Sequence, residues 1–190
     1  RNDKYWGKKA AAPGIDVTYV PDGAARGTAL RTDTADIVEA VPVAQAGNLD
    51  KELLHEVSTP RTITLYLNTG SGAFADPALR AAARNAVDPS ALIKTVFEGH
   101  ADSPVGLLGP AVPWAAEMRA WKKETYPGAT GAAATGKVPG VTAAGSVPAG
   151  TTITLASYTD RPELGEMVPL LARQLEAAGF SVTQDVREYN

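Results

Sequence analysis

Residues 151–186 read TTITLASYTDRPELGEMVPLLARQLEAAGFSVTQDV, and their pattern indicates the fold class. Residues 151–156 and 180–186 are typical of short β-strands. Residues 164–178 between them have apolar side chains at helical spacing, and Gly179 is placed to end that helix. A connection from a strand through a helix to a second strand of the same sheet is right-handed and leaves the two strands parallel. The stretch therefore predicts a compact βαβ unit and an α/β fold.

The helix of this unit has two chemically different faces. Its predicted buried stripe consists of large apolar side chains: Met167, Leu170, Leu171 and Leu175. Its predicted solvent-exposed face consists of polar side chains: Arg173, Gln174 and Glu176. This pattern predicts a helix that packs against the sheet on one side only.

Four segments upstream are further strand candidates because their apolar residues are β-branched or alternate with polar ones: residues 15–20, 35–41, 53–57 and 62–67. The last segment has the clearest pattern, since Ile63, Leu65 and Leu67 fall on one face of an extended chain. Residues 24–31, between the first two candidates, are helix-forming. This strand, helix, strand order again favours an α/β layer.

Two short helices are predicted in the middle of the chain, each begun by an Asp-Pro pair. Asp76 and Asp88 are placed to cap backbone N–H groups, and the following prolines suit the first helical position. The first helix has an apolar stripe at helical spacing: Leu79, Ala82, Ala83, Ala86 and Val87. The second, residues 90–97, ends before Gly99, which favours a left-handed terminating conformation. The two helices are predicted to meet at a corner.

The stretch between these helices and the βαβ unit carries weak signals. Proline and glycine dominate residues 102–113, which predicts a loop, and residues 114–121 are predicted to form a short helix. Residues 127–150 are almost wholly Gly, Ala, Thr, Val and Pro, with too few large apolar side chains to drive packing. We expect residues 127–150 to be a mobile surface excursion.

Composition narrows the class of protein. The 190 residues, 44% hydrophobic and 21% charged, suit a single globular domain or lobe. A net charge of −3 provides no basic field to attract nucleic acid, so no nucleic-acid partner is expected. The absence of cysteine excludes disulfides and thiolate chemistry. No apolar run approaches the roughly 20 residues that span a bilayer.

The sequence contains no convincing catalytic, metal or cofactor motif. His55 and His100 lack partners at metal-binding spacing, so loop positions in solvent account better for both. Residues 131–137 resemble a phosphate-binding loop, but Val138 and Pro139 replace the hydroxyl residue and the helix start that such a loop requires. We therefore expect no enzyme activity, no metal and no cofactor.

Several phrases resemble, in the same order, the extracytoplasmic solute-binding proteins of the peptide/nickel type, called family 5, which feed ABC importers. The phrases lie at residues 1–7 (RNDKYWG), 30–37 (LRTDTADI), 66–68 (YLN), 74–82 (FADPALRAA) and 86–89 (AVDP). Residues 99–113 and 153–182 are similar to later parts of the same family. The chain departs from the family pattern at Asp33-Thr34, at Pro89 and across residues 137–150.

The resemblance implies a periplasmic-binding-protein-like lobe with a mixed β-sheet flanked by helices. Residues 1–190 would form one lobe of two, with residues 1–14 crossing between the lobes and the other lobe lying outside this chain. The ligand of such a protein lies in the cleft between the lobes. On this basis the ligand-binding positions expected in this lobe are Thr59, Phe97, Tyr158, Thr159 and Glu163.

The function that the resemblance implies is capture of a short peptide or similar small solute and its delivery to the permease subunits of an ABC importer. The implied location is extracytoplasmic, either periplasmic or on the cell surface as a lipoprotein, with any membrane attachment through an anchor outside this chain. An alternative from another class is a protein-interaction or scaffold lobe that binds no small molecule. An upstream lipoprotein-type signal and a second lobe would favour the importer component over the scaffold.

Overall fold

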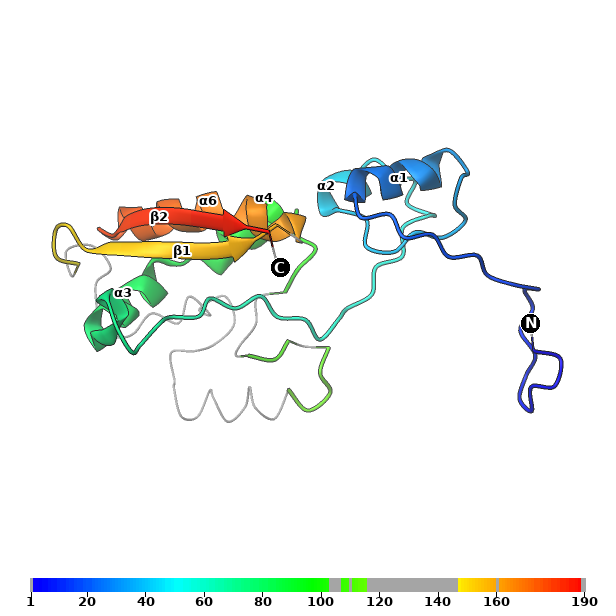
Figure 1. Ribbon diagram of the computed structural model, residues 1–190, viewed down its shortest axis with the longest axis horizontal. Coiled ribbons are helices and arrows are strands. Elements are labelled where there is room, and N and C mark those ends of the chain that lie inside the picture. Colours follow the sequence, from blue (N-terminus) through cyan, green and yellow to red (C-terminus); the bar gives the residue numbers. More distant parts are fainter. Residues whose placement is uncertain (1, 103–106, 110, 116–146, 160, 189–190) are drawn as a thin grey trace.

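The computed structural model describes residues 2–102, 107–109, 111–115, 147–159 and 161–188 (Figure 1). The predicted helix at residues 114–121 lies outside this set from residue 116 onward. Most of the expected mobile excursion, residues 127–146, also lies outside it, so its mobility stays a prediction. The assignment of residues 1–14 to an interlobe crossover stays a prediction as well.

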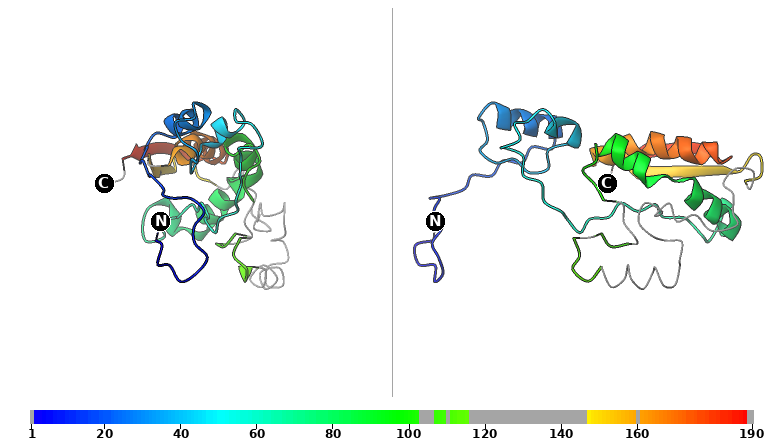
Figure 2. Two further views of the ribbon diagram at one scale, coloured as in Figure 1. Left: turned by 90° about the vertical axis from the view of Figure 1, so that its right-hand side faces the viewer. Right: turned by 180° about the vertical axis from the view of Figure 1, so that it is seen from behind.

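The predicted βαβ unit is confirmed. Strand β1 (Thr152–Tyr158), helix α6 (Pro162–Ala177) and strand β2 (Ser181–Arg187) follow one another, and the strands pair in parallel from Thr152 opposite Ser181 to Tyr158 opposite Arg187. Ile153 and Leu155 are buried while the alternate side chains of β1 are exposed. Since α6 lies along the strands (Figure 2), one face of the sheet is covered by this helix.

Helix α6 is rotated slightly from the predicted orientation. The fully buried positions are Val168, Leu171, Ala172 and Leu175, whereas Met167 and Leu170 are half-buried at the edges of the stripe. Gln174, predicted on the solvent-exposed face, is half-buried, and its Oε1 accepts a hydrogen bond from the backbone N–H of Asp88 at 2.9 Å. Gly179, with φ +106°, ends the helix as predicted.

Helices α3 (Pro77–Ala86) and α4 (Pro89–Val96) confirm the two Asp-Pro starts. Asp76 Oδ1 accepts the N–H of Ala78 at 2.8 Å, and Asp88 Oδ1 accepts the N–H of Ser90 at 2.9 Å. Only two residues separate the helices, and Gly99 has the expected left-handed backbone at φ +92°. A 3-10 turn, η1 (Ala73–Ala75), precedes α3.

The hydrophobic core joins α3 and α6 with the sheet. Its buried members come from these elements and from the turn after α6: Leu79, Ala82, Ala83, Ile153, Leu155, Val168, Leu171, Ala172, Leu175, Ala178 and Phe180. Phe74 packs on Phe180 with ring centroids 5.9 Å apart, which ties the residues before α3 to the start of β2. One continuous core therefore holds the segments that surround the sheet.

The four upstream strand predictions are wrong for the described residues, because residues 15–20, 35–41, 53–57 and 62–67 contain no strand. Instead of a mixed sheet, the described part of the chain has two parallel strands. A strand exists only where a neighbour completes its hydrogen-bond ladder, and Ile15, Val17 and Tyr19 remain 70–91% exposed without such a neighbour in the described structure. The facial pattern of residues 62–67 nevertheless holds, since Leu65 and Leu67 border α3 while Tyr66 is 84% exposed.

Upstream of the core, α1 (Gly23–Arg31) and the short α2 (Val43–Ala46) form a small unit. Arg26 fastens this unit: its Nη1 donates to the carbonyl oxygens of Val20 (2.7 Å) and Pro21 (2.8 Å), and its Nη2 donates to that of Ala40 (2.8 Å). Asp22, four residues before Arg26, caps α1 by accepting the N–H of Ala25. The start of α1 is thus tied to the loop that leads into α2.

The start of α3 has the same arrangement. Arg80 lies four residues after the capping Asp76, and its Nη1 donates to the carbonyl oxygens of Phe74 (2.8 Å) and Ala75 (3.0 Å). In both helices the guanidinium folds back over the first turn and hydrogen-bonds two carbonyls that precede the cap. The sequence spacing Asp-x-x-x-Arg marks both sites.

Candidate ligand-binding site

Tyr158 and Thr159 lie where the parallel strands end. Tyr158 is the last residue of β1, opposite Arg187 in the strand pair, and is 37% exposed. The N–H of Thr159 donates to the carbonyl of Arg187 at 2.9 Å and extends the pairing by one bond. In α/β proteins, ligands bind at this carboxyl edge of parallel strands. The backbone therefore places both predicted residues at a suitable edge.

Glu163 lies in the first turn of α6, directly after that edge. Its Oε1 is 3.9 Å from Nη1 of Arg61, with side-chain exposures of 26% for Glu163 and 58% for Arg61. Thr59 is exposed and lies two residues before Arg61. The ion pair thus brings the segment that carries Thr59 to the start of α6.

Phe97 is half-buried at the C-terminal end of α4, where its N–H donates to the carbonyl of Ile93 at 3.1 Å. Its own carbonyl accepts the N–H of His100 at 2.6 Å. Nδ1 of His100 lies 2.9 Å from Oε2 of Glu56. Since Glu56 is three residues before Thr59, the segment with Thr59 is also held to the loop after α4.

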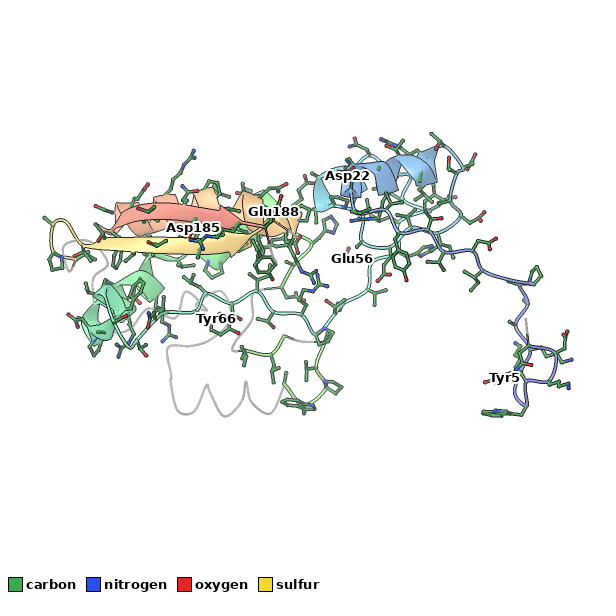
Figure 3. The ribbon with its side chains drawn as sticks, viewed as in Figure 1. Tyr5, Asp22, Glu56, Tyr66, Asp185 and Glu188 are labelled. Carbon is green, nitrogen blue, oxygen red and sulfur yellow. The ribbon has the colours of Figure 1, made fainter. Side chains whose placement is uncertain are left out.

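The structure therefore brings the three predicted segments together through neighbours of the predicted residues. Residues 56–61 contact the loop after α4 at one end and the start of α6 at the other. Figure 3 shows Glu56 on the side of the molecule where Glu188 follows the end of β2. Sequence reasoning missed Glu56, Arg61 and His100 as members of this edge. Their partners lie 44 and 102 residues away in sequence, beyond the reach of any local pattern.

The charges at this edge differ in how firmly they are held. Arg187 donates from Nε to Oδ1 of Asp185 at 2.8 Å and from Nη2 to Oδ2. This hydrogen bonding, with the attraction of the guanidinium charge, lowers the pKa of Asp185 below its ordinary value, against a smaller opposing effect of burial. The same contact raises the pKa of Arg187. Arg187 is thus committed to its neighbour on β2.

A hollow of about 510 Å³ lies elsewhere, between the extended segment 65–67 and helix α3. Its lining is mainly apolar, with two arginines: Leu65, Leu67, Arg80, Ala81, Ala83, Arg84, Val87 and Pro89. None of the five predicted ligand-binding residues borders it. We therefore place the candidate site at the strand edge rather than in this hollow.

Two properties of the described residues concern metals and membranes. No group of three or more His, Cys, Asp or Glu side chains that could hold a metal gathers among them. No helix among them is both long and apolar enough to cross a membrane.

The model of the middle region of family 5 of the bacterial extracellular solute-binding proteins matches residues 1–190. Glutathione-binding protein GsiB of Pectobacterium atrosepticum is 31% identical over 123 residues, which cover 62% of this chain and 24% of that protein. GsiB of Salmonella typhimurium is 29% identical over the same length and coverage. The matched region is thus about a quarter of the length of these curated relatives.

A crystal structure of NikA from Brucella suis in complex with Fe(III)-EDTA has the same fold. It superposes with a TM-score of 0.70 at 24% identity, over 99% of this chain and 40% of that chain. The likeness confirms the predicted periplasmic-binding-protein-like α/β fold. With the match over residues 1–190, it completes the identification: this chain belongs to family 5 of the bacterial extracellular solute-binding proteins.

Proposed function

We propose that this chain is one lobe of a solute-binding protein that captures a small solute in a cleft between two lobes and delivers it to the permease of an ABC importer. The observation that carries this proposal is the family match over the whole chain, residues 1–190. The second lobe would come from residues outside this chain. No bond of the solute is made or broken in this role, so the protein would not act as an enzyme.

The segments of the candidate site support this function because they offer different kinds of contact. Tyr158 offers a partly exposed aromatic ring with a hydroxyl, and Phe97 offers a half-buried ring. Thr59 and Thr159 offer hydroxyl groups, and Glu163 offers a carboxylate. Binding sites for small ligands combine apolar walls with a few directed polar groups. We assign these five residues to this lobe's wall of the cleft.

The solute class that we propose is a short peptide or a solute of similar size. The curated GsiB relatives are named for glutathione, itself a tripeptide, and the NikA structure holds Fe(III)-EDTA. The proposed location is extracytoplasmic, and it is supported by the description of the family as bacterial extracellular solute-binding proteins. Attachment to the membrane would depend on an anchor outside this chain.

The test uses the full-length protein that contains this chain and titration calorimetry with glutathione, trialanine and Fe(III)-EDTA. We expect micromolar binding of at least one of the three, about −8 kcal/mol. Tyr158→Ala is expected to weaken that binding about tenfold, since loss of an aromatic contact at a closed site removes roughly 1–2 kcal/mol.

Tyr66→Ala is the matched control, because Tyr66 is 84% exposed on a segment that borders α3 instead of the strand edge. Its affinity should stay within twofold of the unaltered protein. Failure of all three compounds to bind would contradict the proposed function. Equal losses for the two tyrosine variants would contradict the placement of the site.

A further inference from the structure

The arginines of this chain differ in how their donors are used. Arg26 and Arg80 each hydrogen-bond backbone carbonyls, at distances of 2.7–3.0 Å. Arg187 is held by both carboxylate oxygens of Asp185. A guanidinium bound in these ways has few donors left for another partner. These three arginines therefore stabilise the fold of the chain.

Arg61 is different. Its Nη1 lies 3.9 Å from Oε1 of Glu163, which is beyond hydrogen-bond distance, and its side chain is 58% exposed. Within the described part of the chain, the guanidinium makes no hydrogen bond. Its donors are therefore available to a group that arrives from solvent.

Arg61 lies where its unused N–H donors could contact a bound ligand. Arg61 lies two residues after Thr59, on the segment that the Glu56–His100 contact fastens to the loop after α4. Glu163, half-buried in the first turn of α6, keeps the guanidinium at the strand edge without saturating it. A second lobe closing on this edge would remove water from the arginine and strengthen any charge-assisted bond that it makes.

We propose that Arg61 binds a carboxylate of the captured solute and thereby selects for carboxylate-bearing ligands. This inference rests on the proposed function of solute capture. A guanidinium matches a carboxylate with two parallel N–H···O bonds, which neither a neutral amide nor an ester can replace with equal strength. Glutathione and EDTA, the compounds named for the relative and the neighbouring structure, both carry carboxylates.

The experiment compares each acid with a form that lacks the carboxylate charge. The full-length protein is titrated with trialanine and trialanine amide, and with glutathione and its diethyl ester. For an acid that binds, we expect capping to weaken the Kd at least tenfold. Arg61→Gln should weaken binding of the acid by a similar factor and leave the Kd of the capped form within twofold.

Arg173→Gln is the matched control, because Arg173 is exposed on the same helix as Glu163 but ten residues further along, about 15 Å from it. It should bind both forms as the unaltered protein does, and thermal melting of both variants should be unchanged.

Equal affinity of the unaltered protein for acid and capped form would overturn the inference and leave the proposed function standing. An unchanged preference for the acid in Arg61→Gln would also overturn the inference, as would an unchanged Kd of Arg61→Gln for Fe(III)-EDTA where that compound alone binds. Failure of glutathione and trialanine in both forms, with Fe(III)-EDTA also inactive, would overturn the proposed function and this inference with it.

Discussion

Residues 20–49, the N-terminal unit with α1 and α2, are held together by different interactions from residues 73–99 and 147–188, the C-terminal unit with the sheet. In the N-terminal unit the buried residues are Gly23, Gly27 and Leu49. One long-range hydrogen bond, from Arg26 to the carbonyl of Ala40, ties α1 to the loop before α2, and the glycines of α1 lie close to Pro42 and Gln45. The C-terminal unit buries eleven apolar residues in one cluster. Figure 1 shows the two units joined by an extended segment, the one that carries Glu56 and Arg61.

This difference indicates which part of the chain is rigid. Apolar burial is the dominant favourable term in folding and acts across all members of a cluster, so the C-terminal unit should open only on global unfolding. A few hydrogen bonds each contribute about 1 kcal/mol net, so the N-terminal unit should open locally. The candidate site lies at the boundary, with residues 56–61 fastened to the rigid side at both contacts.

The largest effect is expected from Leu175→Ala. Leu175 is 2% exposed at the centre of the core, and truncation of a buried leucine leaves a cavity and costs about 3–5 kcal/mol. Urea denaturation followed by circular dichroism measures the change in the free energy of unfolding. Glu176→Ala, at the exposed neighbouring position, should change that free energy by less than about 0.5 kcal/mol. A loss below about 1 kcal/mol for Leu175→Ala would show that this unit is not held by its apolar cluster.

A smaller, local effect is expected from Arg26→Met. The substitution removes three hydrogen bonds from a charged donor, so local opening of residues 23–34 should become easier by about 1–3 kcal/mol. Hydrogen exchange should then accelerate in α1 and stay unchanged in α6. The matching change in the rigid unit, Arg80→Met, removes two such bonds beside the core. Its effect should appear in the global free energy of unfolding.

The two arginine variants together test whether the units are separate. If Arg26→Met accelerated exchange in α6 as much as in α1, the units would unfold as one. If Arg80→Met accelerated exchange in α1 alone, the assignment of stability to the C-terminal core would be wrong. Either result would remove the contrast between a polar and an apolar unit.

Local chemistry made much of the C-terminal unit predictable. The Asp-Pro pairs specify both helix starts through contacts within three residues, and Gly99 and Gly179 specify helix ends through their positive φ angles. The βαβ unit follows from adjacent elements and a fixed crossover hand. The sequence could not show that Gln174 reaches Asp88, because that partner is 86 residues away.

The upstream strands failed for a related reason. Alternation along residues 62–67 indicates which side chains share a face, and Leu65 and Leu67 do lie toward α3. It does not indicate whether a neighbouring strand is present, and none pairs with this segment in the described structure. At the site, Arg61 links the segment that contains the predicted Thr59 to the predicted Glu163, and no sequence spacing reveals this pairing.

The smallest effects are expected from a pair of helical glycines. At Gly165 in α6 an added Cβ would meet nothing within 4 Å, so Gly165→Ala should raise the free energy of unfolding by about 0.5–1 kcal/mol through reduced backbone entropy. At Gly23 an added Cβ would lie 2.4 Å from Cγ of Pro42. Gly23→Ala should therefore destabilise α1, because the new methyl group displaces the proline ring. Urea denaturation measures the first change and hydrogen exchange in α1 the second.

Stabilisation by Gly165→Ala together with destabilisation by Gly23→Ala would distinguish the two units more clearly. The rigid unit tolerates an added methyl group on its exposed helix face, because its packing is on the other side of α6. The N-terminal unit packs through its glycines, where α1 approaches Pro42 and Gln45 closely, so even one methyl group separates the two helices. A gain in helix propensity alone would make Gly23→Ala slow hydrogen exchange in α1. If that result were observed, close packing at Gly23 would not be what holds this unit together. Its stability would then depend on Arg26 alone.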